Sequence, residues 1–256
     1  MTGAQAPEVL RRLREATEKI QHFHTDSDQT PLALGVPEAD SKLGGGLAYG
    51  ALHEISPDAP IHLGAACGFT LALAALAAKG GRETLWIQTD FARIEAGAAY
   101  GPGLGLFGLP SQRLLMLRVT RPADALFAME EALKCRALGS VVAELPDDSA
   151  DLTTTRRLSL AARDNGRLGL LLRHRTDARP SAAMTRWSIA AAAGPRDAAG
   201  GIGATAFQLS LIKNRRGPCG RWHLVWKHHD CVFVPAAVSL GVAAASADRP
   251  HRTATA

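Results

Sequence analysis

The chain has 256 residues, with 46% hydrophobic and 21% charged side chains and a formal net charge of +5 at pH 7. This length suits one domain of ordinary size, and the composition excludes a fibrous or fully disordered chain. The four cysteines form no Cys-x-x-Cys pair, no apolar run reaches the roughly 20 residues of a membrane span, and no N-terminal signal segment is visible. We therefore expect a reduced cytoplasmic protein without membrane contact, whose basic excess permits nucleic-acid or acidic partners.

The two ends of the chain differ from the middle. Leu10, Leu13 and Ile20 recur at helical spacing between charged residues, which predicts an amphipathic N-terminal helix over residues 1–24. Residues 25–41 are polar and contain prolines, so we interpret them as a linker to a core domain over residues 42–234. Residues 235–256 show no apolar periodicity, and we expect a disordered tail there.

The core domain alternates between strand and helix patterns. A glycine-rich turn leads into a strand over residues 51–55, and an Ala/Leu-rich helix follows over residues 63–79. Further strands are predicted over residues 84–89, 113–119, 140–144 and 168–172. Helices are predicted over residues 122–138 and 151–165, the second capped by Asp151, and a Gly/Pro-rich loop over residues 101–110. This alternation predicts an α/β fold with a mostly parallel central sheet.

The last part of the core has a different pattern. Residues 185–193, 206–214 and 221–227 alternate between apolar and polar side chains, and the last two runs flank a turn at residues 215–220. These runs predict antiparallel strands at one edge of the sheet. Trp187, Trp222 and Trp226 lie in them, and we expect core positions rather than stacking on nucleic-acid bases.

A strand, a loop and a helix near the start of the core match the general layout of a phosphate-binding site. The nearest match to G-x-x-x-x-G-K-[ST] runs from Gly64 through Gly68 to Thr70, but it is one residue too short. Phe69 stands where the lysine belongs, and no Gly-Lys pair occurs in the chain. We therefore expect no ATP binding, although backbone N–H groups of a Gly64–Thr70 loop offer a weaker alternative.

With these elements placed, the chain resembles the core of RecA-type recombinases over about residues 32–234. The resemblance places Asp90 at the position of the catalytic glutamate and Glu144 near the Walker B aspartate. Because the phosphate-loop lysine is missing, we expect these acids to be relics of a site for Mg²⁺ and water. The alternative is that they are solvated or cap a helix. Lys213 and Arg215 match two lysines that reach the ATP of a neighbouring RecA subunit.

Within this superfamily, Gly44-Gly-Gly-Leu-Ala-Tyr-Gly-Ala-Leu-His-Glu54 is similar to the ImuA family of damage-inducible bacterial mutagenesis proteins. That resemblance implies a non-catalytic adaptor in SOS-induced translesion synthesis. Its expected partners are RecA, ImuB and an error-prone replicative-type DNA polymerase, with single-stranded DNA reached indirectly. Two alternatives stay open: an active RecA-type ATPase with a divergent phosphate loop, and a cell-division inhibitor like SulA.

Two surfaces are candidates for partner binding. One is the apolar face formed by Leu10, Leu13 and Ile20, and the other is the basic hairpin that carries Lys213, Arg215, Arg216 and Arg221. A run of cations is often only a solvated face, but this one coincides with the strand that the resemblance places at a subunit interface. No metal site is expected at His228-His229, because adjacent strand residues point to opposite faces.

Overall fold

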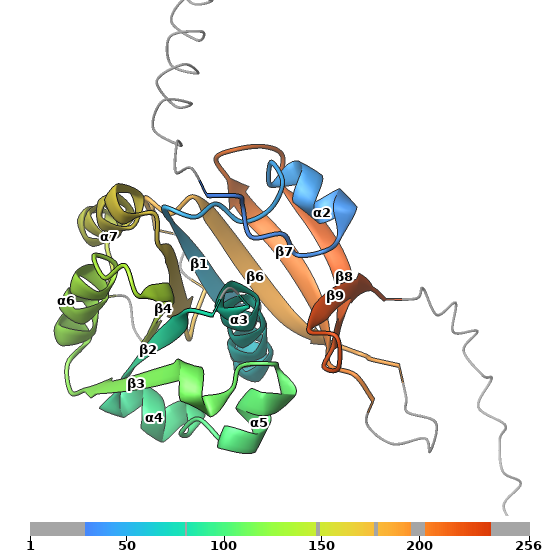
Figure 1. Ribbon diagram of the computed structural model, residues 1–256, viewed down its shortest axis with the longest axis horizontal. Coiled ribbons are helices and arrows are strands. Elements are labelled where there is room, and N and C mark those ends of the chain that lie inside the picture. Colours follow the sequence, from blue (N-terminus) through green and yellow to red (C-terminus); the bar gives the residue numbers. More distant parts are fainter. Residues whose placement is uncertain (1–28, 80, 147–148, 177–178, 196–202, 237–256) are drawn as a thin grey trace, which may run out of the picture.

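The computed structural model describes residues 29–79, 81–146, 149–176, 179–195 and 203–236. The described residues form a nine-stranded sheet in the order β3-β2-β4-β5-β1-β6-β7-β8-β9 (Figure 1). Strands β1 to β6 pair in parallel, and β6 to β9 pair antiparallel. The predicted α/β class, with a parallel centre and antiparallel C-terminal strands, is therefore confirmed.

Helices separate the strands in sequence from β1 to β5, whereas the described residues between β5 and β9 contain no helix. The strands are β1 (Ala51–Pro57), β2 (Glu83–Thr89), β3 (Leu114–Val119), β4 (Leu138–Leu145), β5 (Leu168–Arg173), β6 (Thr185–Ala192), β7 (Ala206–Asn214), β8 (Gly220–Lys227) and β9 (Val232–Pro235). The helices are α2 (Pro37–Lys42), α3 (Leu63–Ala78), α4 (Asp90–Ala96), α5 (Gly101–Leu106), α6 (Pro122–Ala132) and α7 (Leu152–Asn165), with short 3₁₀ helices η1 (Pro60–His62) and η2 (Ser111–Arg113).

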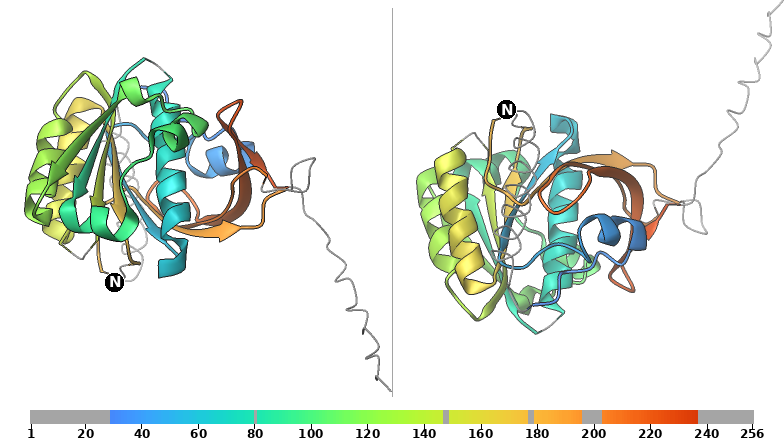
Figure 2. Two further views of the ribbon diagram at one scale, coloured as in Figure 1. Left: turned by 90° about the horizontal axis from the view of Figure 1, so that it is seen from below. Right: turned by 90° about the horizontal axis from the view of Figure 1, so that it is seen from above.

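Helix α3 is the centre of the larger core. Figure 2 shows α6 and α7 on one face of the parallel strands and α3 on the other, with the antiparallel strands curling around α3. Alanine and leucine occupy most sides of α3, as is typical of a helix that is buried all round. By length and apolarity alone, Pro60–Ala78 would also qualify as a membrane span, but most of it is buried in this core.

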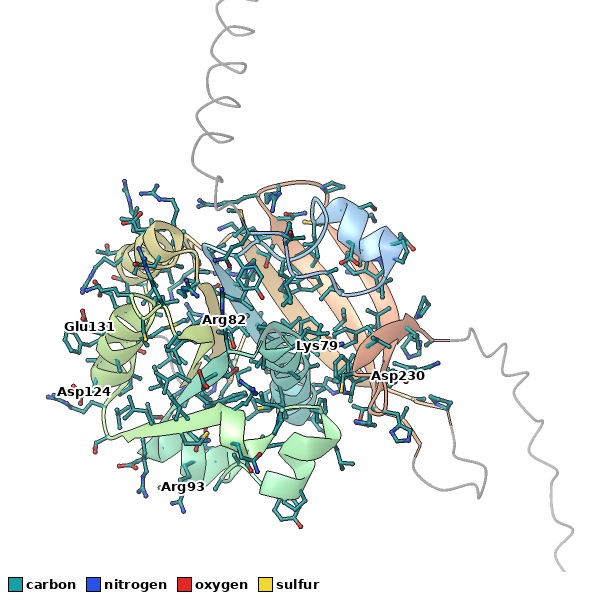
Figure 3. All side chains as sticks on the ribbon, in the orientation of Figure 1. Lys79, Arg82, Arg93, Asp124, Glu131 and Asp230 are labelled. Atoms are coloured by element: carbon teal, nitrogen blue, oxygen red, sulfur yellow. The ribbon has the colours of Figure 1, made fainter. Side chains whose placement is uncertain are left out.

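The aromatic side chains of the antiparallel half pack against α3. Trp187, Trp222 and Trp226 are all buried, which confirms their assignment to the core. Phe69 of α3 lies 5.6 Å from Trp187 and 5.6 Å from Phe233, measured between ring centroids. At the C-terminal end of α3, the Lys79 ammonium donates to the Cys231 carbonyl at 2.9 Å, beside Asp230 in the turn before β9 (Figure 3).

The interpretation of residues 25–41 as a linker is wrong for the residues that the structure describes. Leu34 and Val36 are buried in the core, and residues from Pro37 onward form α2. Asp40 holds this segment, because its carboxylate accepts the backbone N–H groups of Leu34, Gly35 and Val36 at 2.8, 3.0 and 3.1 Å. Polar composition indicated a linker, whereas alternate apolar residues and one carboxylate attach the segment to the fold.

Two further boundaries differ from the sequence prediction. Residues 101–106 form α5 rather than a loop, with Pro102 in the first turn, where a missing N–H costs nothing. Helix α6 ends at Ala132, six residues before the predicted end, and residue 138 already belongs to β4.

The prediction of a helix over residues 151–165 is confirmed: Asp151 accepts the Thr154 N–H at 2.7 Å, and Gly166 ends the helix at φ 64°. The predicted N-terminal helix and most of the tail lie outside the described residues.

Candidate functional site

The predicted phosphate loop lies inside a helix. Gly64, Gly68, Phe69 and Thr70 all belong to α3, so no loop exists there to surround a phosphate. Phe69 is fully buried among aromatic rings, and the Thr70 hydroxyl donates to the Ala66 carbonyl at 2.8 Å. Gly68 lets two rings approach, since an added Cβ would lie 3.2 Å from Phe107. Phe69 and Thr70 are therefore core residues, Gly68 is half-buried, and Gly64 is exposed in the first turn of α3.

The connection that does link β1 to the next helix comprises residues 58–62. This stretch, Asp-Ala-Pro-Ile-His, has neither glycine nor lysine. The Asp58 N–H donates to the Ile189 carbonyl at 2.8 Å, and its carboxylate accepts the Ser188 hydroxyl at 3.0 Å. Pro60 removes one N–H, and Asp58 places a negative charge where a phosphate site needs positive charge. The connection is thus bonded to β6 and lacks the groups that hold a nucleotide.

The Asp90 carboxylate is hydrogen-bonded to neighbouring side chains. It is the first residue of α4, after Thr89, whose hydroxyl caps that helix by accepting the Ala92 N–H at 3.1 Å. The Asp90 carboxylate accepts hydrogen bonds from Arg118 of β3 and from the Thr120 hydroxyl, the latter at 3.2 Å. The hydrogen bond from Arg118 is the main reason that the pKa of Asp90 lies below its ordinary value. Asp90 is therefore an ion-pair partner of the sheet edge and an unsuitable base.

Glu144 is neither solvated nor a helix cap, so that interpretation is wrong for this residue. It is buried at the C-terminal end of β4 and accepts three hydrogen bonds. Trp86 Nε1 and Gln88 Nε2 of β2 each donate to one carboxylate oxygen at 3.0 Å, and His174 Nε2 contacts the other oxygen at 2.8 Å. A buried carboxylate with these partners is a structural anchor between β2, β4 and the end of β5.

His174 continues this network outward. Its second ring nitrogen, Nδ1, lies 3.2 Å from a carboxylate oxygen of Glu95 at the end of α4. Burial by itself would lower the pKa of His174, but the hydrogen bonds and charges of Glu144 and Glu95 outweigh it, and the pKa is raised above its ordinary value. The imidazole therefore joins α4 to the sheet, with one ring nitrogen at each carboxylate, and these two contacts favour its protonated form.

A cavity of about 440 Å³ opens beside this network. Helix α3 forms one wall, β2 and β3 form the floor, and the segment from residue 96 to Phe107 forms the other side. Leu71, Leu104, Leu114 and Met116 make it largely apolar, and Glu144 and Gln88 supply its polar groups. The cavity is therefore shaped for an apolar group more than for a charged nucleotide.

A second buried network lies on the opposite face of the sheet. Glu54 of β1 is buried and accepts from Arg173 at 3.2 Å, Arg186 at 2.8 Å and the Ser181 hydroxyl at 2.6 Å. Sequence analysis missed Glu54, Arg173 and Arg186, although a charged residue within an otherwise apolar strand was a usable signal. Their partners come from distant parts of the chain, which no local pattern identifies.

The basic hairpin is only partly a free surface. The Lys213 ammonium is half-buried and donates to the Ser181 carbonyl, and its pKa is lowered by burial, then by Arg215 and Arg186. Arg215, Arg216 and Arg221 are exposed. The structure thus brings Lys213 next to the Glu54 network and leaves the three arginines facing solvent. Leu10, Leu13 and Ile20 lie outside the described residues.

Comparison with known proteins places the chain in a family. No family model matches it. The ImuA proteins of two strains of Caulobacter vibrioides, NA1000 / CB15N and ATCC 19089 / CIP 103742 / CB 15, are each 30% identical over 208 residues, which cover 75% of this chain and 82% of the relative. The crystal structure of the RadB recombinase superposes with a TM-score of 0.53 at 14% identity, covering 77% of this chain and 96% of RadB. This likeness establishes a RecA-like fold, and the identity and coverage together show that the chain belongs to the ImuA family.

Proposed function

We propose that the protein is a non-catalytic, RecA-like adaptor in damage-induced mutagenesis. In this proposal it acts in error-prone translesion synthesis through protein contacts, binding RecA and ImuB and, through them, an error-prone replicative-type polymerase. The ImuA family membership supports the pathway. The observation that carries the non-catalytic part is the β1–α3 connection, which has Asp58 and Pro60 where a phosphate loop has glycines and a lysine.

The contacts made by Asp90 and Glu144 support the same proposal. Phosphoryl transfer depends on positioning groups, a metal ion and a residue that orients water. Asp90 is bonded to Arg118, and Glu144 accepts three buried hydrogen bonds. Freeing Glu144 for Mg²⁺ or water would break buried hydrogen bonds between β4 and β2, and freeing Asp90 would break its ion pair with Arg118. The chain retains the scaffold of a recombinase core and uses its catalytic positions for stability.

The first experiment measures ATP binding and hydrolysis by the purified full-length protein, with and without single-stranded DNA. We expect no turnover above that of a buffer blank, because the β1–α3 connection lacks the glycines and the lysine that hold a phosphate. DNA-stimulated hydrolysis that co-purifies with the protein and disappears in a Glu144→Gln variant would support the alternative of an active ATPase. Isothermal titration with ATP and Mg²⁺ checks binding separately, since an adaptor that binds nucleotide without hydrolysis would still fit a scaffold role.

The second experiment identifies the partners. Tagged protein from DNA-damaged cells, analysed by mass spectrometry, should co-purify RecA, ImuB and the polymerase. Recovery of the tubulin-like division protein in their place would favour the SulA-like alternative. Each candidate contact is then repeated with purified components, so that a bridging protein is distinguished from a direct partner.

A further inference from the structure

Four arginines stand at the starts of four neighbouring parallel strands. Each occupies one of the two positions directly before its strand: Arg113 before β3, Arg82 before β2, Arg136 before β4 and Arg167 before β5. These strands are consecutive in the sheet, in the order β3-β2-β4-β5, and neighbouring strands lie about 4.8 Å apart. Because these strands are parallel and begin at the same edge of the sheet, the four residues form a row along that edge.

Three of these arginines meet at the start of β4. Arg167 is only 6% exposed, and its Nη1 donates to the Leu138 carbonyl at 2.9 Å. An added Cβ at Gly139 would lie 3.0 Å from the Cβ of Arg82, so Arg82 packs against the same strand. Arg82 and Arg136 are exposed. One buried and two exposed arginines therefore form a cluster, which we call the arginine cluster.

The charges of the arginine cluster are not neutralised. In the part of the chain that the structure describes, no carboxylate forms an ion pair with any of its three members. The acids closest to them in sequence pair with other cations: Glu83 with Arg113 at 4.0 Å, Glu131 with Lys134 at 2.5 Å, and Asp164 with Arg163 at 3.2 Å. Burial lowers the pKa of Arg167, and the charges of Arg82 and Arg136 lower it further. The three like charges repel one another, and an anion bound among them would relieve this repulsion.

The surroundings of the arginine cluster suit nucleic acid better than a protein partner. Protein interfaces usually centre on apolar or aromatic anchors, and no large apolar side chain is exposed among the described residues of 79–82, 133–137 and 165–167. Contacts between cations and phosphates are sufficient for nucleic-acid binding that does not depend on sequence. All three cations are arginines, whose planar guanidinium groups can bind a phosphate through two hydrogen bonds.

We propose that the arginine cluster binds the phosphodiester backbone of a nucleic acid without reading its sequence. The cluster lies at the amino-terminal edge of the parallel strands, whereas Glu144 and the β1–α3 connection lie at the carboxyl-terminal edge. A bound backbone follows the row of arginines from β5 toward β3, where Arg113 lies. The function proposed above reaches DNA only through partner proteins, so this direct contact is an additional property that does not depend on them.

Fluorescence anisotropy with labelled oligonucleotides tests this property on the full-length protein. The probes are a single strand and a duplex of the same mixed sequence, each titrated between about 50 and about 200 mM salt. We expect the logarithm of the affinity to fall with the logarithm of the salt concentration, with a slope of roughly −2 to −3, as for about three phosphate contacts. Binding of either form supports a backbone site, and comparison of the two forms identifies the preferred nucleic acid. Failure of both probes to bind at about 50 mM salt and about 100 µM protein would overturn the proposal.

Paired substitutions locate the contact. Arg82→Ala with Arg136→Ala should weaken binding at least about tenfold at the lower salt concentration and make the slope shallower by roughly 2, because two phosphate contacts are lost. Arg82→Lys with Arg136→Lys should restore part of the affinity, since lysine keeps the charge. The matched control is Arg93→Ala with Lys227→Ala, which removes the same charge from two exposed residues near the opposite edge (Figure 3 labels Arg93) and should change affinity less than about twofold.

The control also decides whether binding follows net charge alone. Equal losses in the control and in Arg82→Ala with Arg136→Ala would mean that it does, and the proposed site would be wrong. Both substituted arginines are exposed, so thermal midpoints near that of the wild type should show that unfolding does not cause the loss.

A labelled poly-glutamate peptide with the same net charge as the single strand tests an acidic protein segment as the competing occupant. We expect it to bind more weakly than the DNA. If it binds more tightly than the DNA and loses affinity in Arg82→Ala with Arg136→Ala, the occupant is a protein segment and the proposal is wrong.

Discussion

At the residue scale, Phe69 occupies the sequence position of the phosphate-loop lysine, but its side chain packs in the hydrophobic core. Its ring lies 5.6 Å from Trp187, 6.2 Å from Phe207 and 5.6 Å from Phe233, between centroids. These contacts join α3 to the antiparallel strands that curl around it. A lysine there would have to bury its ammonium group among aromatic rings, which is strongly unfavourable without a partner.

Phe69→Ala is therefore expected to destabilise the protein by about 3–5 kcal/mol, because it removes a fully buried ring and leaves a cavity. Urea unfolding followed by tryptophan fluorescence measures the change. Ile61→Ala, at a side chain in η1 that is 85% exposed, is the matched control and should change stability by less than about 0.5 kcal/mol. Similar losses for both variants would contradict the assignment of Phe69 to the core.

His174 makes the stability of the fold sensitive to pH. Its folded-state pKa is raised, so its protonated form stabilises the native state fully below about pH 6.5, the ordinary value. This contribution is lost as the pH rises through the higher folded-state pKa. His174→Gln should therefore lose about 1–2 kcal/mol near pH 6 and less near pH 8.

Thermal midpoints at a series of pH values check this dependence. His223→Gln, at an exposed histidine on β8, is the control and should follow the wild-type curve. A constant difference between wild type and His174→Gln at every pH would mean that the ring only fills space between Glu144 and Glu95.

At the element scale, the segment before β1 behaves as part of the core. Asp40 accepts three consecutive backbone N–H groups, and Leu34 and Val36 are buried beneath them. Gly46 fixes the following turn at φ 136°, where an added Cβ would lie 2.4 Å from the Leu32 carbonyl oxygen. This stretch therefore has little freedom to act as a hinge.

Asp40→Ala should lower stability by about 1–3 kcal/mol, since three N–H groups lose their shared charged acceptor. Glu38→Ala in the same helix is the control, because the Glu38 side chain is exposed, and its effect should be small. Chemical denaturation separates the two variants. If Asp40→Ala has the same free energy of unfolding as the wild type, then residues 31–42 contribute less to stability than their burial indicates.

At the scale of the whole molecule, the exposed arginines of the hairpin remain the candidate for a RecA contact. The change Lys213→Ala with Arg215→Ala should weaken binding to ATP-loaded RecA filaments by more than about tenfold, because charge-assisted contacts are lost. Lys213 also donates to the Ser181 carbonyl, so Arg215→Ala alone is the variant that leaves the fold untouched. Arg93→Ala with Lys227→Ala removes the same charge from two other exposed cations and serves as the control.

Binding of the same variants to bare single-stranded DNA tests the alternative that the hairpin binds DNA and not RecA. If the hairpin variant loses affinity equally for DNA and for RecA filaments, with a steep dependence on salt, the cluster is a phosphate-binding surface. If affinity for RecA filaments is unchanged, the contact lies elsewhere on the protein.

Much of the fold could be predicted because the relevant information is local. An unbroken apolar run such as residues 168–172, an N-cap such as Asp151 and a C-cap such as Gly166 each act within a few residues. The candidate site was less predictable. Spacing between glycines pointed to Gly64 and Gly68, yet both lie within α3, and the true connection at residues 58–62 has none of the residues that a motif search uses.

The sequence by itself determined the α/β class, the order of most elements, the core positions of the tryptophans and the absence of a Gly-Lys pair. These follow from periodicity, capping residues and composition, which depend on neighbours along the chain. Only the tertiary structure decided that His174 joins Glu144 to Glu95, that Glu54 accepts hydrogen bonds from Arg173, Arg186 and Ser181, and that β2, β3 and α3 line a common cavity. Those features depend on which strands lie side by side, and this order is set by packing between residues that are far apart in sequence.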